Sequence, residues 1–440
     1  MPRPDRPARR SVRRPAALPV IVAAVLALVA AACGGGGIGS GDDASGATGG
    51  VVAPSDDAGQ RAAVDASAPV DELVSGFGDA GFDLLRTQPV DTNVVFSPLS
   101  IGHALLMARA AADADTGAAI DTTFGLPPGM AAHDAWNALD AALIAGNGAA
   151  IAIDESPTPV IAVADRLWPA TTAFPDQSWI DLMATHHGAD VETIDVTDGE
   201  GSRQRINEWV AEETNQLIPQ LLPAGFIDDN TVLVLTDTVY FKAQWAYTFG
   251  KYGPEDGVFT RLDGSTVDVA YMVELEQPGP RGVGDGFVGA ELPYLGDDYS
   301  MLIIVPDEGR FDDVRGRMSS AFLAEVDGAF TTGPYELRLP KWETTTSIDL
   351  LGWLADAGIA PGAFPGIGSG VELGGAVHGA DIAVDEVGTE AAAATALGFN
   401  ESGPPEPELV VAAERPFLYV IRHVDSSAVL FAGQVTDPSG

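Results

Sequence analysis

The residue types that most often carry enzyme chemistry occur in this chain without the spacing that catalytic motifs need. No serine lies in a Gly-x-Ser-x-Gly nucleophile elbow. The only Gly-Lys pair, Gly250-Lys251, is followed by Tyr252, whereas a P-loop needs Ser or Thr there. The six histidines show no zincin spacing, and the single cysteine cannot build a thiolate metal site. These patterns give no support for an enzyme, although a catalytic triad assembled from distant residues stays open at this point. We expect no metal and no cofactor.

Two further patterns have a plain structural interpretation. Gly284, Gly286 and Gly289 match the dinucleotide pattern Gly-x-Gly-x-x-Gly. However, Ala-Glu-Leu-Pro-Tyr follows, and that sequence cannot start the helix that a dinucleotide site requires. The adjacent histidines His186 and His187 are typical of a partly exposed helix end rather than of a ligand pair.

The segment between Asp385 and Asn400 has a pattern that favours a conformational change rather than catalysis. Its side chains alternate in character with a period of two, as in a β-strand. One set is small at its start and apolar at its end: Thr389, Ala391, Ala393, Thr395, Leu397 and Phe399. A Pro-rich stretch that must be loop follows at once. The segment therefore fits two environments, an exposed loop and a strand with one buried face. Gly388 would be the pivot between them.

The same segment resembles the hinge of the reactive loop in inhibitory serpins. Other blocks stand in the order in which serpins carry them, and the resemblance spans residues 71–438. These blocks are Asn93–Ser100, Ile206–Val210, Val239–Lys242, Val377–Ala380, Arg415–Leu418 and Phe431–Val435. The resemblance implies an α+β serpin fold: a single large domain with a large central β-sheet, further sheets, about eight to nine helices and an exposed reactive loop.

The resemblance also implies a mechanism. A serine protease cleaves the loop and forms an acyl-enzyme, residues 389–399 insert into the central sheet as a new strand, and the tethered protease is distorted. The implied hinge residues are Glu386, Gly388, Thr389, Glu390, Ala391, Ala392, Ala393 and Ala394. Ser97, Ser100 and His378 would form part of the shutter through which the sheet opens.

The position of the scissile bond is open. Aligning the Pro404-Pro405-Glu406 stretch places it between Glu401 and Ser402, which we prefer, whereas counting from the hinge places it after Ser402. Glu401 would favour proteases that accept an acidic residue. A bond nearer Phe399 would favour chymotrypsin-like enzymes.

Some residues depart from the family pattern. Asp165 and Asp237 stand where serpins usually have Asn, and Gly379 stands where they often have Lys. The stretch from Glu406 to Glu414 is about three residues longer than is usual in serpins. Because Asn can donate a hydrogen bond and an ionised Asp cannot, the two aspartates are expected to alter hydrogen bonding where the sheet opens.

The elements that must position these residues are also visible. Ser97-Pro98 predicts a helix cap and first turn. Residues 203–217 predict a helix that Pro219 ends. Buried strands are expected at Thr231–Phe241, Ser300–Val305 and Tyr335–Leu339, and a C-terminal hairpin at residues 417–424 and 428–435.

The N-terminus has the pattern of an export signal. Residues 1–14 carry six arginines, an uncharged apolar run follows to Ala32, and Cys33 comes next. This resembles a bacterial lipoprotein signal, so we expect residues 1–32 to be a signal peptide and Cys33 to carry the lipid. Residues 33–70 would be a flexible Gly/Ala/Asp-rich linker. The folded part would then lie at the extracellular face of the membrane; a secreted protein is the alternative.

Composition narrows the partners. A formal charge of −40 disfavours binding to nucleic acid. The stretch between Arg109 and Arg166 contains no Lys or Arg, so it offers no basic stripe to a polyanion cofactor.

We expect a monomer that forms covalent complexes with serine proteases. The alternatives are a non-inhibitory serpin that acts as a binding protein, a lipid-anchored solute receptor and an exported hydrolase. A stable protease complex would distinguish the inhibitor from the binding protein, and substrate turnover would reveal a hydrolase.

Overall fold

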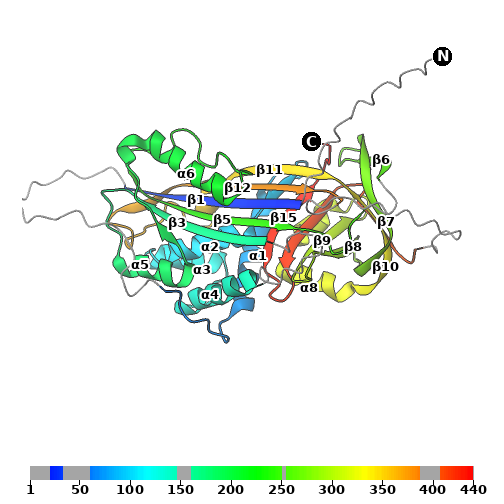
Figure 1. The fold of residues 1–440 in the computed structure, drawn as a ribbon, viewed down its shortest axis with the longest axis horizontal. Helices are drawn as coiled ribbons and strands as arrows, with labels where there is room; N and C mark the ends of the chain where they lie inside the picture. Colours follow the sequence, from blue (N-terminus) through cyan, green and yellow to red (C-terminus); the bar gives the residue numbers. More distant parts are fainter. Residues whose placement is uncertain (1–19, 33–59, 146–159, 250–253, 387–406, 440) are drawn as a thin grey trace, which may run out of the picture.

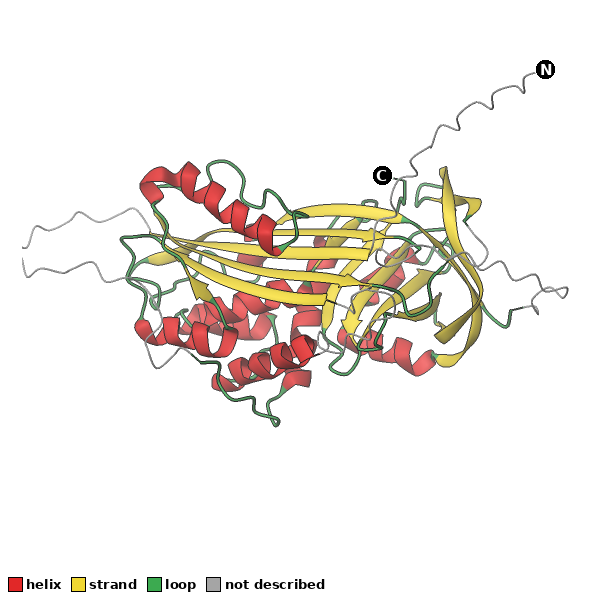
Figure 2. Ribbon diagram, viewed as in Figure 1, coloured by secondary structure: helices red, strands yellow, loops and turns green. Residues whose placement is uncertain are grey.

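The computed structural model describes residues 20–32, 60–145, 160–249, 254–386 and 407–439. These parts form an elongated α+β molecule in which a long central sheet has helices on both faces (Figures 1 and 2). Helix α6 lies above the sheet in Figure 1, and helices α2 to α5 lie below it. The arrangement confirms the expected fold class, with nine α-helices in the described part of the chain.

The central sheet has six strands among the described residues. In spatial order they are β11 (Trp342–Asp349), β12 (Val371–Val384), β1 (Val20–Ala32), β5 (Thr231–Ala243), β3 (Val160–Pro169) and β4 (Asp190–Val191). All neighbouring pairs are antiparallel except β3 and β4.

A second sheet of nine strands forms the other end of the molecule. In spatial order its strands are β13 (Val410–Ala412), β10 (Thr331–Pro340), β7 (Thr266–Gly284), β8 (Phe287–Pro293), β9 (Tyr299–Pro306), β14 (Phe417–His423), β15 (Val429–Val435) and β2 (Val94–Phe96), and β6 (Glu255–Thr260) pairs with β7. Strands β14 and β15 are buried along their whole length, so their sequences are nearly continuous apolar runs.

The helices connect and cover the two sheets. They are α1 (Val70–Thr87), α2 (Pro98–Arg109), α3 (Ala114–Thr123), α4 (Met130–Ala145), α5 (Gln177–Leu182), α6 (Gly199–Glu213), α7 (Phe311–Arg317), α8 (Ser320–Ala329) and α9 (Leu351–Asp356). A π-helix, η3 (Met183–His187), follows α5, and a 3₁₀ turn, η4 (Val196–Asp198), precedes α6.

Helix α2 begins as its sequence predicts. The Ser97 side chain accepts a hydrogen bond from the Ser100 backbone N–H, and Pro98 occupies the first helical position. Every residue from Pro98 to Ala108 is buried, so α2 is apolar on all sides and lies inside the core.

Helix α6 differs from its predicted bounds. It starts at Gly199, capped by the Asp198 side chain, and ends at Glu213 rather than Leu217. Asn215 and Gln216 have φ angles of 50° and 68°, which are incompatible with a right-handed helix. The helix therefore stops before Pro219 is reached, and its inner face packs Ile206, Trp209 and Val210 on the sheet.

Strand β1 is the part of the fold that the sequence did not predict. Its backbone pairs with β12 from Ile21↔Ala383 to Ala32↔Val371 and with β5 from Val20↔Ala243 to Ala31↔Thr231. In the full-length chain the predicted signal segment is therefore a strand of the central sheet. Cleavage before Cys33 would remove it, and the export signal itself stays a prediction. Among the described residues, no helix combines the length and apolar character needed to cross a membrane.

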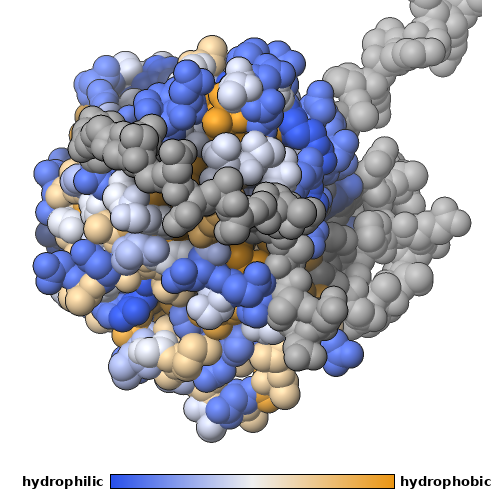
Figure 3. Space-filling model, turned by 90° about the vertical axis from the view of Figure 1, so that its left-hand side faces the viewer, coloured by the Kyte–Doolittle hydropathy of each residue, from blue (hydrophilic) through white to orange (hydrophobic). Residues whose placement is uncertain are grey.

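The surface is mixed in character. On the face shown in Figure 3, hydrophilic and apolar residues are interspersed among the described parts. Many of the exposed acidic groups pair with arginines, as in the Arg203–Glu200 and Arg310–Asp313 bridges. Such exposed pairs contribute little to stability, so the core has to hold the fold.

Gly433 provides a test of the core around β15. A Cβ atom there would lie 2.1 Å from the Val94 carbonyl oxygen and 2.4 Å from the Tyr419 hydroxyl. We expect Gly433→Ala to lower the free energy of unfolding by about 1–3 kcal/mol, because the backbone of β2 must move. Gly328→Ala in α8 is the matched control, since nothing lies within 4 Å of its Cβ position. It should be neutral or stabilising in urea unfolding. Equal effects of the two variants would contradict this packing.

Candidate functional site

The site is built around one strand position in the central sheet, which we call the central position: the place between β12 and β5 that β1 occupies. Because β1 is antiparallel to both neighbours, β12 and β5 run parallel to each other. Strand β12 ends at Val384, and the predicted hinge begins two residues later at Glu386. The chain thus enters the predicted loop directly from a border of the central position.

The exit of the chain from β12 is held by three contacts. The Trp245 indole Nε1–H donates to the Asp385 carbonyl oxygen at 2.9 Å, and the Phe249 backbone N–H donates to the Glu386 carbonyl oxygen at 3.0 Å. Lys341 Nζ lies 3.0 Å from Glu386 Oε1. These contacts fix the start of the predicted loop against the segment that follows β5 and against Lys341, which lies between β10 and β11.

The chain returns from the predicted loop to the other sheet. The Glu336 backbone N–H donates to the Leu409 carbonyl oxygen, and β13 then pairs in parallel with β10. Arg281 Nη2 lies 3.3 Å from Glu408 Oε2 near this point. The two ends of the segment are therefore attached to different sheets.

The structure describes only some of the predicted site residues. Glu386 is described. The other hinge residues (Gly388 and Thr389 to Ala394), the preferred scissile pair Glu401–Ser402 and the lipidation residue Cys33 lie outside the described residues.

The three predicted shutter residues lie together. The Ser97 backbone N–H donates to His378 Nε2 at 3.0 Å, and the Ser100 backbone N–H donates to Ser97 Oγ at 3.0 Å. All three residues have no exposed surface. His378 lies on β12, so this cluster joins the start of α2 to one border of the central position.

A second link joins the same helix to the other border. His103 Nδ1 lies 2.5 Å from Asp237 Oδ2, and Asp237 lies on β5. In the backbone register, Leu26 of β1 pairs with both His378 and Asp237, so the two links lie at the same level of the sheet. Helix α2 therefore contacts both borders of the central position.

The sequence contained a signal for this second link that was not used. Ser97, Ser100 and His103 are spaced by three residues, so they share one face of the helix. The departures at Asp165 and Asp237 then supply acceptors for a histidine. Asp165 and Asp237 are direct partners across β3 and β5.

The link continues into the helices below the sheet. His103 Nε2 lies 2.8 Å from His187 Nδ1, and His187 Nε2 lies 2.9 Å from His133 Nδ1. The expectation of a partly exposed His186–His187 pair is thus wrong for His187, which is 3% exposed. It is buried because η3 directs it toward α2 and α4, while His186 stays near the surface beside Asp134.

This cluster also includes the described residues best placed to hold a metal. One donor atom each from His103, Asp165 and Asp237 lie within 4.8 Å of one another. However, the 2.5 Å between His103 Nδ1 and Asp237 Oδ2 is a hydrogen-bond distance. Two ligands of one tetrahedral zinc ion lie about 3.3 Å apart. The arrangement fits a proton between these atoms better than a metal ion.

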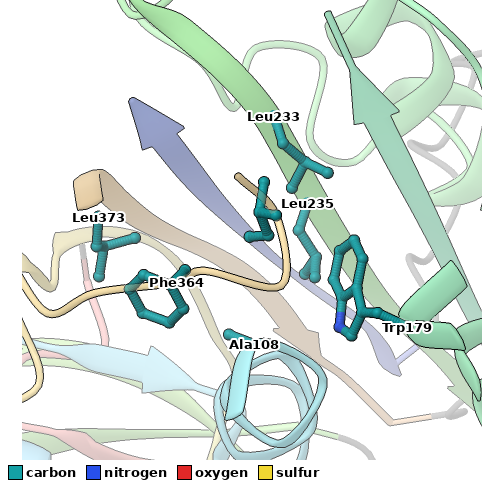
Figure 4. Close-up of a pocket in the computed structure, with 7 residues that line it drawn as sticks. Ala108, Trp179, Leu233, Leu235, Phe364 and Leu373 are labelled. Carbon is teal, nitrogen blue, oxygen red and sulfur yellow. The ribbon is translucent and has the colours of Figure 1, made fainter. Parts of the chain in front are cut away.

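A small apolar pocket lies at the far end of the central position from the predicted hinge. Figure 4 shows Leu233 and Leu235 of β5 facing it from one side and Leu373 and Phe364 from the other. Trp179 and Ala108 close it from the helix layer. Its chemistry suits aliphatic or aromatic side chains, and it offers no group that could act on a substrate.

These features define a class of protein: a single domain whose central sheet accommodates an added strand beside the start of the predicted loop. The family model for serpins, the serine protease inhibitors, matches residues 74–438. The chain belongs to the serpin family.

Relatives and solved structures agree with this assignment. The chain is 31% identical over 296 residues to Serpin B13 of Homo sapiens, covering 63% of this chain and 74% of that protein. It is 30% identical over 376 residues to Serpin-Z1 of Arabidopsis thaliana, covering 81% and 92%. Arabidopsis AtSerpin1 in its native stressed conformation matches with a TM-score of 0.71 at 25% identity, over 86% of this chain and 100% of that chain. Human thyroxine-binding globulin shares the fold at 24% identity, with a TM-score of 0.71 over 84% and 100%.

The two serines of the shutter should differ in their effect on stability. Ser97 Oγ caps α2, so Ser97→Ala should lower the free energy of unfolding by about 1 kcal/mol. Ser100 Oγ is buried with no hydrogen-bond partner among the described residues, so Ser100→Ala should change it by less than about 0.5 kcal/mol. Urea unfolding of both variants checks this. A larger loss for Ser100→Ala than for Ser97→Ala would show that the cap is not the stabilising contact.

Proposed function

We propose that the mature protein is a suicide-substrate inhibitor of serine endopeptidases, which traps the acyl-enzyme by inserting its cleaved loop into the central sheet. One observation supports this most directly. The sheet accommodates a strand of 13 residues at the central position, and that strand comes from outside the serpin domain. The position therefore accepts an added strand without any change in the order of the other strands.

The predicted loop has the direction and length to use the same position. A strand that follows β12 after a tight turn must run antiparallel to it, as β1 does. Residues 389–399 would span roughly 36 Å when extended. Their small residues come first, so they would enter between β12 and β5 before the larger Leu397 and Phe399.

The free energy for insertion would come from backbone pairing. With the central position empty, β12 and β5 run parallel, and parallel pairs are slightly less stable per residue. An inserted strand replaces one such pair with two antiparallel pairs and adds about ten hydrogen bonds. At about 1 kcal/mol net for each, the gain is on the order of 10 kcal/mol.

The chemistry starts with the protease. Its serine oxygen attacks the Glu401 carbonyl carbon, the Glu401–Ser402 bond breaks, and Ser402 leaves as a new amino terminus. The protease is then esterified to Glu401, at the end of the segment that inserts. If insertion is faster than hydrolysis of the ester, the protease is carried with the strand and trapped.

The proposal also includes a location. The export signal and Cys33 support attachment of the mature chain to the outer face of a membrane through a lipid on that cysteine. Residues 33–70 would then act as the tether.

Substitution at the hinge tests the trap. Thr389→Arg places a charge on the face that must become buried, so insertion should slow and the stoichiometry of inhibition should rise several-fold above one. Glu390→Arg is the matched control because it lies on the opposite face of the same strand, and it should stay near one. The readout is SDS-stable complex with a serine protease that cleaves after Glu. An unchanged stoichiometry for Thr389→Arg would contradict insertion. If the unaltered protein formed no complex with any serine protease, the alternative of a non-inhibitory binding serpin would be favoured instead.

Removal of the leader tests the central position itself. The full-length chain, with β1 in place, should be cleaved as a substrate without trapping the protease. A chain that starts at Cys33 should trap it and should melt at a lower temperature before cleavage. Full-length Leu26→Pro is the control, because proline cannot pair on both sides of a central strand. It should behave like the shortened chain, and equal trapping by the unaltered full-length chain would show that β1 does not block the position.

A further inference from the structure

The serpin mechanism does not require the two aspartates that depart from the family pattern. Asp165 is 7% exposed and Asp237 is fully buried. Each has one carboxylate oxygen, Oδ1, with no hydrogen-bond partner among the described residues. Two negative charges at adjacent buried positions repel strongly, so such a pair retains one proton and shares it.

The three histidines form a directed chain that ends at this pair. His103 Nδ1 contacts Asp237 Oδ2, His103 Nε2 contacts His187 Nδ1, and His187 Nε2 contacts His133 Nδ1. If Asp237 Oδ2 accepts from His103, each following histidine must donate from Nδ1 to the one before it. In this arrangement each of the two inner imidazoles donates once and accepts once. A further proton on His103 or His187 would place two N–H groups face to face. An added proton on an inner histidine therefore breaks at least one contact of the histidine series.

The elements around the three histidines and two aspartates carry few charges that could neutralise this cluster. Trp136 of α4 stacks on the His103 ring at 3.4 Å between ring centroids. The charged and titratable groups that face the cluster from the surrounding elements are Arg61 from the N-terminal segment, Arg109 of α2, Asp134 and Asp140 of α4, His186 of η3 and His378 of β12. Asp140 is already paired with Arg61, so neither is available to neutralise the cluster.

The pKa directions agree with the geometry. Burial, with the Asp237 charge added, raises the pKa of Asp165 well above its ordinary value. Burial and the neighbouring histidines lower the pKa of His187, and burial lowers that of His133 to about 4.

These shifts change stability with pH in opposite directions. The unfolded chain binds more protons than the folded one between pH 6.5 and about 4, so the histidines reduce stability as the pH falls through that range. The folded chain retains the Asp165 proton above the ordinary pKa of 3.8, so the stability from this proton is lost as the pH rises through the raised pKa.

We propose that Asp165, Asp237, His103, His187 and His133 form a proton-gated latch that fixes β5 to α2 and so controls the opening of the central sheet. Gain of a proton by the histidines breaks the contacts that hold His103 to η3 and α4, and loss of the shared proton by the aspartates places two charges between β3 and β5. Either change weakens the attachment of β5. Because α2 also contacts β12 through His378, release of β5 frees one border of the central position while the other stays attached. The latch does not depend on any protease, so it stands or fails separately from inhibition.

Hydrogen–deuterium exchange of the full-length protein between pH 4.5 and 9 tests the latch. The readout is the protection of peptides that cover Thr231–Ala243, corrected for the intrinsic exchange rate. We expect protection of β5 to be highest in the middle of this range and to fall by up to about tenfold per pH unit on both sides. Peptides from β14 should show no such change.

Three variants separate the two limbs of the profile. Asp165→Asn supplies an amide donor to Asp237 and removes the shared proton, so the alkaline fall should disappear. His133→Asn keeps the donor to His187 but cannot be protonated, so the acid fall should move to lower pH. Asp381→Asn is the control, because Asp381 is a buried carboxyl on β12 that binds Thr345 outside the cluster. It should leave both limbs in place. A flat profile for the unaltered protein, or an Asp165→Asn profile that matches it, would overturn the proposal.

Discussion

The fold depends on the backbone pairing of one strand position. Strands β12 and β5 both have free hydrogen-bonding edges unless a strand lies between them or they pair directly with each other. Unpaired backbone groups inside a sheet are costly, so the position must either be filled or be closed by bringing β12 and β5 together. Three features bear on whether the central position is filled or closed. They are the strand order of the sheet, the entry of the predicted loop from β12 and the contacts of α2.

Helix α2 is the element that connects the two borders of the central position, β12 and β5, to the rest of the core. It is buried on every side, and its polar side chains are therefore confined to the few places where partners exist. Ser97 caps its first turn beside His378 of β12, and His103 contacts Asp237 of β5. Because α2 is buried and contacts both borders, a change in the distance between β12 and β5 must alter at least one of these contacts. A surface helix with the same sequence spacing would not be coupled to that distance.

Local signals explain what could be predicted from the sequence. The cap at Ser97, the strands at Thr231 and Ser300 and the C-terminal hairpin rest on short-range patterns, and the structure confirms them. The end of α6 was missed because two positive φ angles replaced the expected stop at proline. The burial of His187 and its contact with His103 depend on residues 84 positions apart, which no local pattern reports. Most predicted hinge residues lie outside the described residues, so that part of the site still rests on the resemblance.

Strand β1 has a consequence for the order of events during synthesis. It is the first element in the described part of the chain, and its partners β5 and β12 begin about 200 and 340 residues after it ends. A leader that stays attached is already present when those partners leave the ribosome, whereas the competing segment is translated after β12. The leader can therefore pair with β5 at the central position before the competing segment has been synthesised. A chain that loses its first 32 residues before it folds would leave the central position vacant.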